Sequence, residues 1–281
     1  MRVLVTHKAD LDGIFCVVLA KACYNDIKTV LCDYQDVNAT VEAIIEDPEV
    51  TELFITDLSV TPEVAEKLDK WPYTKYLLDH HETAKPLTIY PWVKLDTTQC
   101  GTSIFYGHLL LLGNTNMKAY KEVVKRVRDH DLWKHSYPES AKLSLLLRLV
   151  GPERFCARFL EEPSYRLRPV EEFIIELEEE RRLKYITQTS YTLHSNKDGV
   201  PFAMCIADEY VSEVGHAIVE QANVEYALII SPRHQTASLR GKGNVNLSQL
   251  AKQCGGGGHP KAAGFPLSGG AKAMIKNMLG D

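Results

Sequence analysis

The sequence predicts an α/β protein: an N-terminal domain with a parallel sheet and flanking helices, a linker helix, and a smaller C-terminal α/β domain. Three observations support this prediction. Short β-prone runs alternate with segments of helical period over the first 80 residues, a charged stretch of helical spacing comes later, and a second group of strands and helices begins at Pro201. The predicted domains are residues 1–135, a helical connector over residues 136–195, and residues 196–281.

The N-terminal sheet is predicted from four short β-prone runs. Helical segments separate these runs, and crossover helices of this kind join parallel strands of one sheet. Several runs end on an acidic residue, which would lie at the carboxyl edge of the sheet, where open α/β sheets bind ligands. The predicted strands are Arg2–Thr6, Thr29–Leu31, Glu52–Thr56 and Lys75–Leu78, and the predicted crossover helices are Gly13–Tyr24, Val37–Glu46 and Thr61–Lys70.

The rest of the chain predicts further helices and more strands. Prolines at positions 138, 152, 163 and 169 indicate a less regular boundary region. Pairs of Glu with Arg or Lys at helical spacing predict an exposed connecting helix from Val170 to about Leu193. The other predicted helices are Gly101–Leu112, Met117–Val127, Val211–Gln221, Leu247–Gln253 and a last helix after a glycine run, and the predicted strands are near Phe202–Ala207, Tyr226–Ile230 and Thr236–Leu239.

Composition places the chain among soluble globular proteins. Of its 281 residues, 45% are hydrophobic and 25% are charged, and no apolar stretch approaches the roughly 18 residues of a membrane-spanning helix. The first strand-like run is too short for the core of a signal peptide, so we expect a cytoplasmic protein with no membrane partner. The seven cysteines are odd in number and never spaced as C-x-x-C, which favours small buried side chains over disulfides or a zinc ribbon.

Charge is unevenly distributed along the chain. The net charge is −5, but residues 231–281 contain seven Lys or Arg and one acid, a local charge of +6 that leaves −11 on residues 1–230. Two interpretations stay open at this point. The charges are either ordinary solvated surface, or they mark a metal-binding body followed by a segment that attracts phosphates.

A group of carboxylates and imidazoles is predicted at the carboxyl edge of the N-terminal sheet. Its first members, His7, Asp10 and Asp12, follow the first strand within the sequence THKADLDG. A single histidine or aspartate there would most often be a hydrogen-bonded structural residue or a helix cap. Two aspartates this close along the chain repel each other unless a cation or another partner compensates their charge.

Later strands add donors to the same edge. Asp57 ends the third strand in FITDLS, and Asp79, His80 and His81 end the fourth strand after the apolar run YLL. Carboxylates and imidazoles without a thiolate suit Mn²⁺ or Mg²⁺, with Co²⁺ or Zn²⁺ also compatible. About six donors of this kind would accommodate two divalent ions.

The motifs THKADLDG, TD at residues 56–57 and DHH at residues 79–81 closely resemble, in content and order, those of the DHH phosphoesterase family. That family includes RecJ-like exonucleases, short-oligonucleotide nucleases and manganese pyrophosphatases. The resemblance implies that Asp57 bridges two metal ions and that His81 faces the scissile phosphate. The implied ligands of the first ion are His7, Asp10 and Asp57, and those of the second are Asp12, Asp57, His80 and a later aspartate.

Two positions complicate the family pattern. Lys8 stands where the family usually has a short polar residue, but it is not a ligand. The later aspartate falls in the sequence RDHDLW, which offers both Asp129 and Asp131, and we favour Asp129 as the ligand. Residues two apart on a helix do not face the same way, so only one of them is expected to enter the site. Asp131 would then act beside the site or cap the turn around Trp133.

A run of four glycines is the second strong feature. The sequence GGGGHPKAAGF begins at Gly255, and its glycines impose a large ordering cost on a folded chain. A flexible linker fits poorly between a helical segment and the compact AAGFPL. A ligand-binding loop explains the glycine run better, because glycines let main-chain N–H groups approach a phosphate or a base edge, with a histidine and a lysine beside them. The predicted substrate-binding residues are therefore Gly255, Gly256, Gly257, Gly258, His259 and Lys261.

This second pattern resembles the DHH-associated C-terminal domain, in which a glycine-rich loop and an upstream arginine grasp the substrate. Arg240, in SLRGKGNVN, matches that arginine. The resemblance thus covers almost the whole chain in two blocks, and it separates the chain from the manganese pyrophosphatases, whose C-terminal domain differs. A related domain follows the catalytic parts of alanyl-tRNA synthetases, so the loop alone would indicate RNA contact and not hydrolysis.

The combined motifs suggest a metal-dependent phosphodiesterase or exonuclease that hydrolyses short oligonucleotides to mononucleotides. Two divalent ions, Mn²⁺ in preference to Mg²⁺ or Co²⁺, would activate a hydroxide for in-line attack on phosphorus. His81 and His259 would balance charge on the phosphate oxygens. Arg240, Lys261 and the glycine amides would hold the terminal phosphate or nucleotide of a short single-stranded RNA or DNA.

Alternative functions stay open at this stage. Linear or cyclic dinucleotides and adenosine 3′,5′-bisphosphate are rival substrates within the same enzyme class. A nucleotide or RNA sensor without turnover is disfavoured, because a sensor should have lost metal ligands and the predicted ligand positions are all occupied. The sequence leaves open the polarity of cleavage, the preference for RNA or DNA, the preferred chain length, and whether the protein is a homodimer.

Overall fold

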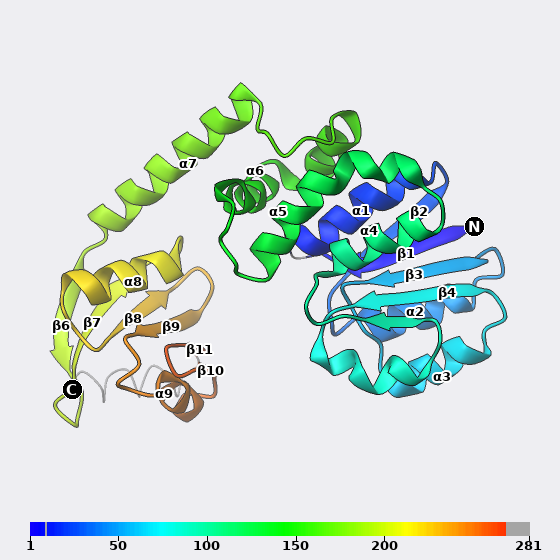
Figure 1. The fold of residues 1–281 in the computed structure, drawn as a ribbon. Helices are drawn as coiled ribbons and strands as arrows, with labels where there is room; N and C mark the ends of the chain where they lie inside the picture. Colours follow the sequence, from blue (N-terminus) through cyan, green and yellow to red (C-terminus); the bar gives the residue numbers. More distant parts are fainter. Residues whose placement is uncertain (9, 268–281) are drawn as a thin grey trace. The chain divides into compact units, whose positions relative to one another are not determined.

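The structure, a computed structural model, describes residues 1–8 and 10–267 of the chain (Figure 1). The chain divides into two compact units, Met1–Ile175 and Glu176–Asp281. The division falls inside a single helix, α7 (Pro169–Gln188), which is later in the chain than residue 135, where the sequence favours the end of the first domain. The mixed α/β fold class predicted from the sequence is confirmed.

The first unit contains the predicted parallel sheet. Its strands lie in the order β2-β1-β3-β4-β5, and every neighbouring pair is parallel. The sequence predicts four of these strands and misses the short β5 (Val93–Leu95), which follows the 3₁₀ segment η1 (Glu82–Ile89). The other four strands are β1 (Arg2–His7), β2 (Ile27–Cys32), β3 (Glu52–Thr56) and β4 (Thr74–Asp79).

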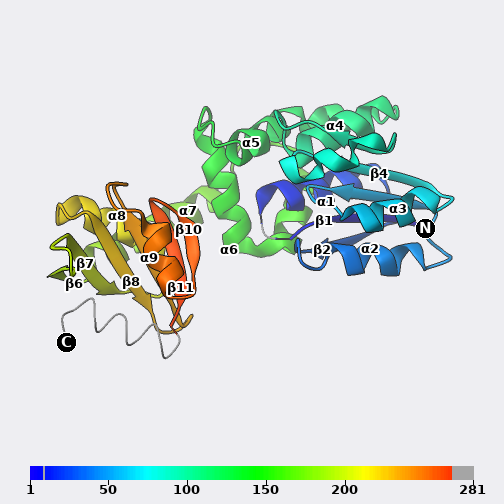
Figure 2. The same cartoon turned by 90° about the horizontal axis from the view of Figure 1, so that it is seen from below.

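Helices cover both faces of this sheet (Figures 1 and 2). Side chains alternate between the faces along each strand, so Leu4 and Phe54 belong to one hydrophobic core while Val3, Val5 and Leu53 belong to the other. The first core is shared with α1 (Leu11–Cys23), α4 (Gly101–Leu111), η2 (Thr115–Tyr120), α5 (Lys121–Asp131) and α6 (Pro138–Glu161), and the second with α2 (Val37–Ile45) and α3 (Pro62–Lys70). Burial on both faces explains why the strands are apolar over most of their length.

Most of the proline-rich middle of the chain is helical, which corrects the expectation of a less regular stretch except at residues 162–168, where Pro163 lies between two helices. Pro138 and Pro169 stand at the first positions of α6 and α7, where the missing N–H costs nothing. Pro152 follows a kink at Gly151, whose φ of 80° lies in the left-handed region. Helix α6 packs into the first core through Phe155 and other buried residues, so it is part of the first unit and not a boundary segment.

The second unit is built on a mixed sheet in the order β10-β11-β9-β8-β7-β6, in which only the β7–β8 pair is parallel. The strands are β6 (Tyr191–Ser195), β7 (Pro201–Ile206), β8 (Tyr226–Ser231), β9 (Thr236–Gly241), β10 (Gly257–His259) and β11 (Ala262–Pro266), and the helices are α8 (Val211–Gln221) and α9 (Leu247–Gln253). Helix α7 ends at Gln188 and not near Leu193, because the β-prone sequence that follows pairs with β7.

The glycine run forms part of a β-hairpin. Its last two glycines and His259 make β10, which pairs antiparallel with β11. The helix predicted after the glycine run falls outside the described residues. No helix in the part of the chain that the structure describes is long and apolar enough to span a membrane.

Candidate metal centre

The end of β1 and the start of α1 hold His7 and Asp10 together. Asp10 caps α1 by accepting the backbone N–H of Gly13 at 3.0 Å, and its other carboxylate oxygen lies 2.8 Å from Nδ1 of His7. Residue 13 has to be glycine, because a Cβ there would lie 2.1 Å from the carbonyl oxygen of His7. Burial raises the pKa of Asp10, but the hydrogen bonds from His7 and Gly13 outweigh it, and the pKa falls below its ordinary value.

Asp12 lies in the first turn of α1 and is 2% exposed. Its two carboxylate oxygens accept the backbone N–H groups of Gly101 at 2.7 Å and Thr102 at 2.8 Å, which begin α4. Donors at a helix N-terminus stabilise a carboxylate in this position. Gly101 is needed because a Cβ there would lie 2.6 Å from Cβ of Asp57. No motif of the sequence includes Gly101 or Thr102, although a glycine that opens an apolar helical segment is a signal for such a close approach.

Asp57 lies between these groups and follows β3. Its φ of 56° is in the left-handed region, which costs a non-glycine residue roughly 1–2 kcal/mol. The side chain is 2% exposed; Oδ1 lies 3.2 Å from Nε2 of His80, and Oδ2 lies 3.9 Å from Nδ1 of His7. Burial raises the pKa of Asp57 well above its ordinary value, and the carboxylates of Asp12 and Asp10 raise it further. A strained and buried carboxylate beside other carboxylates calls for compensating positive charge.

The DHH motif gives its two histidines different environments. Asp79 is fully buried, and its Oδ1 accepts the backbone N–H of His80 at 2.8 Å and lies 2.7 Å from Nδ1 of His81. Burial lowers the pKa of His80, and the neighbouring His81 lowers it further. The hydrogen bond to Asp79 raises the pKa of His81. His80 is therefore suited to bind a cation as a neutral imidazole, whereas His81 is suited to carry positive charge.

Asp131 lies among the donors of the site, whereas Asp129, which the sequence favours, is held by backbone N–H groups. Asp129 is buried but accepts the backbone N–H groups of Ser136 at 2.9 Å and Tyr137 at 3.3 Å, so it holds the turn that leads into α6. Asp131 has an oxygen 3.7 Å from Nδ1 of His80. The two aspartates face different ways on the last turn of α5, as their spacing predicts.

The environment of Asp131 matches that of the other site carboxylates. Burial, followed by the charges of Asp12 and Asp10, raises the pKa of Asp131 to about 7. A sequence signal for this residue exists, because Asp131 comes four residues after Val127 and therefore shares its buried helix face.

The donors around Asp57 form three overlapping groups, and the donor atoms of each group lie within 4.8 Å of one another. The groups are His7, Asp10 and Asp57; Asp12, His80 and Asp131; and Asp57, Asp79, His80 and His81. Buried carboxylate oxygens normally have hydrogen-bond partners. Here Oδ2 of Asp57, Asp79 and Asp131 are buried without one. Unpaired carboxylate oxygens beside imidazoles fit the divalent metal that the family resemblance implies.

In the second unit, Arg240 lies on β9, in the strand next to the glycine hairpin. It stands opposite Ala262 of β11 in the ladder, and its guanidinium donates to the carbonyl of Leu239 and to Oγ of Ser212, both at 2.8 Å. Burial lowers the pKa of Arg240. A guanidinium has five N–H donors in a fixed geometry, so Arg240 keeps donors for an anion in addition to these contacts.

Backbone geometry requires three of the four glycines of the hairpin, for different reasons. A Cβ at Gly256 would lie 2.1 Å from the carbonyl oxygen of Gly264, and one at Gly258 would lie 2.6 Å from that of Ala262. Gly255 has a φ of 76°, in the left-handed region. At Gly257, in contrast, a Cβ would meet no atom of the described residues within 4 Å. The predicted His259 and Lys261 are exposed at the turn between β10 and β11.

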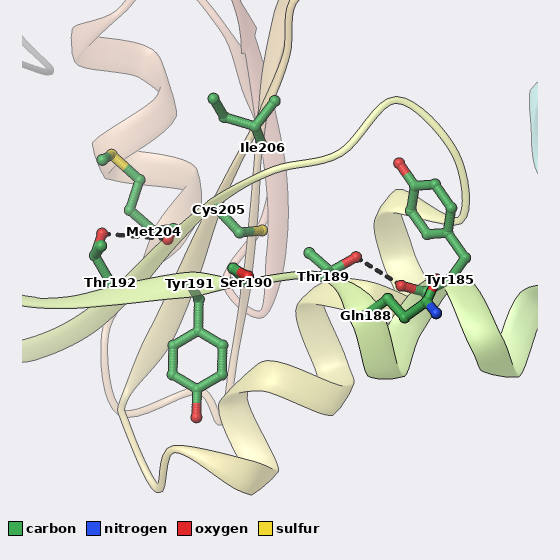
Figure 3. Close-up of a pocket in the computed structure, with 9 residues that line it drawn as sticks. All are labelled: Tyr185, Gln188, Thr189, Ser190, Tyr191, Thr192, Met204, Cys205 and Ile206. Atoms are coloured by element: carbon green, nitrogen blue, oxygen red, sulfur yellow. Dashed lines mark hydrogen bonds between the residues drawn. The ribbon is translucent and has the colours of Figure 1, made fainter.

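A separate pocket of about 600 Å³ lies where α7 meets β6 and β7 (Figure 3). Along its wall Thr189 donates to the carbonyl of Tyr185 at 2.8 Å, and Thr192 donates to that of Met204 at 3.4 Å. Its lining residues are hydroxyl, amide, thiol and apolar side chains, without a carboxylate or an imidazole. The pocket therefore lacks the donors of the metal centre.

Fold and site together define a DHH-type hydrolase, and comparisons with known proteins confirm this class. Oligoribonuclease NrnB of Bacillus subtilis is 28% identical to the chain, over 94% of this chain and 72% of its own length. No family model matches the chain. The similarity to this relative extends over most of the chain, and solved structures add the fold.

Two solved structures share the fold over nearly all of this chain. The pGpG-specific phosphodiesterase PggH from Vibrio cholerae has a TM-score of 0.61 at 13% identity, covering 98% of this chain and 96% of that one. RecJ from Thermus thermophilus, solved in complex with Mn²⁺, has a TM-score of 0.53 at 15% identity, covering 99% of this chain and 51% of that one. The resemblance to the DHH phosphoesterase family, in its RecJ-like branch, is confirmed.

Proposed function

We propose that this protein is a divalent-metal-dependent phosphodiesterase that hydrolyses short oligonucleotides to mononucleotides. The observation that carries the proposal is the cluster of carboxylates and imidazoles at the carboxyl edge of the first sheet, with three buried carboxylate oxygens that have no hydrogen-bond partner. The relative named oligoribonuclease NrnB, similar over most of the chain, supports short oligonucleotides as the substrate class.

The proposed cofactor is a pair of divalent ions, with Mn²⁺ preferred and Mg²⁺ or Co²⁺ as substitutes. His7, Asp10 and Asp57 would hold one ion, and Asp12, Asp57, His80 and Asp131 the other. When bound, such ions neutralise charge on the phosphate and make water more acidic near neutral pH. His7 and Asp10 are already held next to each other at the end of β1, because Asp10 contacts both His7 and the backbone N–H of Gly13. This supports the assignment of both residues to one ion.

His81 is proposed to act on the scissile phosphate. The Asp79 carboxylate can only accept, so it keeps a proton on Nδ1 of His81 and leaves Nε2 for the substrate. The raised pKa of His81 favours the imidazolium, whose Nε2–H would donate to a phosphate oxygen and offset the charge that develops there. Asp79 thereby orients His81 and stabilises its charge.

The glycine hairpin and its neighbours are proposed to bind the substrate chain. Arg240 and Lys261 would contribute positive charge for a phosphate, and His259 would balance charge on the phosphate oxygens. Gly257 supports this role, since its lack of a side chain is not explained by any neighbouring atom and leaves its backbone open to a close approach. Short single-stranded RNA or DNA is the proposed substrate.

The direct test is the release of mononucleotides from 5′-labelled di- to penta-ribonucleotides in Mn²⁺. We expect turnover by the wild type and a loss of activity of about 10³-fold in Asp57→Ala. Removing a group that only supports a metal ligand already lowers metal affinity or activity by about 10–100-fold. Glu66→Gln on the exposed face of α3 is the matched control and should keep full activity. Equal inertness of the wild type and Asp57→Ala contradicts the proposal.

The same assay distinguishes the rival substrates. Linear and cyclic dinucleotides and adenosine 3′,5′-bisphosphate are compared with the oligonucleotides at equal concentration. The proposal expects the highest kcat/KM for one of the short linear oligonucleotides. A protein that binds these compounds at saturating Mn²⁺ without turning over any of them would be a sensor.

A further inference from the structure

Tyr34 contacts two histidines of the metal centre, although no motif of the sequence includes it. It follows β2 in the loop before α2, and its side chain is half exposed. The hydroxyl oxygen lies 3.0 Å from Nε2 of His81. Its ring centroid lies 4.7 Å from that of His7. An exposed tyrosine thus contacts two side chains of the metal centre.

The loop that presents Tyr34 is tied to the metal centre. Lys8, directly after His7, forms an ion pair with Asp33 at 2.7 Å, and its backbone N–H donates to the carbonyl of Cys32 at 3.2 Å. The carbonyl of Asp33 in turn accepts the N–H groups of Asp36 at 3.0 Å and of the residue after it. The lysine that departs from the family pattern thus has a partner in the loop that carries Tyr34.

With Tyr34 in place, the His81 ring is held at both nitrogens. Nδ1 lies 2.7 Å from Oδ1 of Asp79, and Nε2 lies 3.0 Å from the hydroxyl of Tyr34. Since Asp79 can only accept, the two contacts fix both the ring plane and the nitrogen that faces the substrate side. A contact to Asp79 alone would leave Nε2 without a partner to oppose small rotations about the Cα–Cβ and Cβ–Cγ bonds.

We propose that Tyr34 is a positioning residue for His81. Its hydroxyl keeps the contact with Nε2 throughout the reaction, so that the ring of His81 stays aimed at the side from which a phosphate oxygen of the substrate approaches. This inference rests on the proposed function, in which His81 acts on the scissile phosphate. A group that is oriented before the substrate arrives lowers the barrier to reaction more than it strengthens binding, so the contribution of Tyr34 falls on kcat and not on KM.

The test uses Tyr34→Phe, which keeps the ring and its contact with His7 and removes only the hydroxyl. We expect kcat on a diribonucleotide in Mn²⁺ to fall about tenfold, the size of one lost hydrogen bond, with KM within about twofold of the wild type. Tyr73→Phe is the matched control, since Tyr73 is also exposed in the same unit and its ring contacts Trp71. The control should leave both constants unchanged.

A second readout separates a positioning role from the proposed activity itself. Side-chain ¹⁵N NMR of the metal-free protein at a fixed pH should show the Nε2 resonance of His81 shifted in Tyr34→Phe and unshifted in Tyr73→Phe. Calorimetry with Mn²⁺ should give equal affinities for wild type and both variants, because Tyr34 is not a metal ligand. These measurements decide the role of the contact even if the wild type turns over none of the oligonucleotides.

Two results would overturn the inference. One is a Tyr34→Phe variant whose kcat and His81 resonances match those of the wild type. The other is a Tyr34→Phe variant with weakened Mn²⁺ binding, because the hydroxyl would then act on the metal centre itself and not on the orientation of His81.

Discussion

The metal centre of the first unit and the glycine hairpin of the second differ in how well the fold alone explains their unusual residues. At the metal centre, a left-handed aspartate and buried unpaired carboxylate oxygens oppose stability, so packing gives no reason for them. In the hairpin, Gly255, Gly256 and Gly258 are already required by backbone geometry. Buried, unpaired charge is therefore the stronger evidence of function, and glycine content is the weaker.

The largest effects are expected when two aspartates on α5 are replaced by asparagine, one at a time. Asp131→Asn should reduce Mn²⁺ affinity and turnover by on the order of 10² or more, because it removes a charged donor from the site. Asp129→Asn should keep Mn²⁺ affinity but lower the free energy of unfolding by about 1–3 kcal/mol, since Asp129 accepts two backbone N–H groups before α6.

Calorimetric titration and thermal melts of both variants check this pair. If Asp129→Asn lost the metal while Asp131→Asn retained it, the placement of the later aspartate would have to be reversed.

An intermediate effect is expected from two neighbouring glycines of the hairpin. Gly256→Ala should destabilise the protein by about 1–3 kcal/mol, because its Cβ would overlap the backbone of β11. Gly257→Ala should fold with normal stability, since the Cβ meets open space, and should raise KM for oligonucleotides about tenfold at unchanged kcat.

Denaturant unfolding and steady-state kinetics measure the two glycine variants. An unchanged KM in Gly257→Ala would remove the functional argument for the hairpin and leave only the metal centre.

A third prediction concerns the pH dependence of stability in the metal-free protein. The folded pKa of Asp131, about 7, is above its ordinary value of 3.8, so the folded state holds this proton more tightly than the unfolded state does. Stability from this group is therefore complete below about pH 4 and is lost as the pH rises toward 7.

Asp131→Asn lacks that titration, so its stability relative to the wild type in EDTA should increase between pH 4 and 7. Urea unfolding at several pH values measures the difference, and Asp129→Asn serves as the comparison. Parallel stability profiles of wild type and Asp131→Asn would argue against an uncompensated carboxylate at this position.

Much of the fold and of the metal centre could be predicted from the sequence, because alternating apolar runs and the donors that end them are local signals. Strands β1 to β4 and the donors His7, Asp10, Asp12, Asp57 and His80 were recognisable in this way. The prolines misled, because a proline that starts a helix and one that breaks a helix look the same without a view of packing.

What the sequence could not predict depends on contacts between distant segments. Gly101 approaches Asp57, and Thr102 donates to Asp12, only after α4 packs against the sheet. Tyr34 reaches His81 from a loop 47 residues away in the chain. The choice between Asp129 and Asp131 depended on the backbone N–H groups of Ser136 and Tyr137, which occupy Asp129. Strands β10 and β11 are stabilised mainly by pairing and not by residue preference.

The measurement that tests the central claim most directly is anomalous diffraction at the manganese edge from crystals soaked in Mn²⁺. The account predicts manganese peaks within coordination distance of His7, Asp10, Asp12, Asp57, His80 and Asp131, with Asp57 contacting more than one ion, and no such peak at Asp129. Crystals that take up no manganese among these residues, at a concentration that supports turnover in solution, would contradict it.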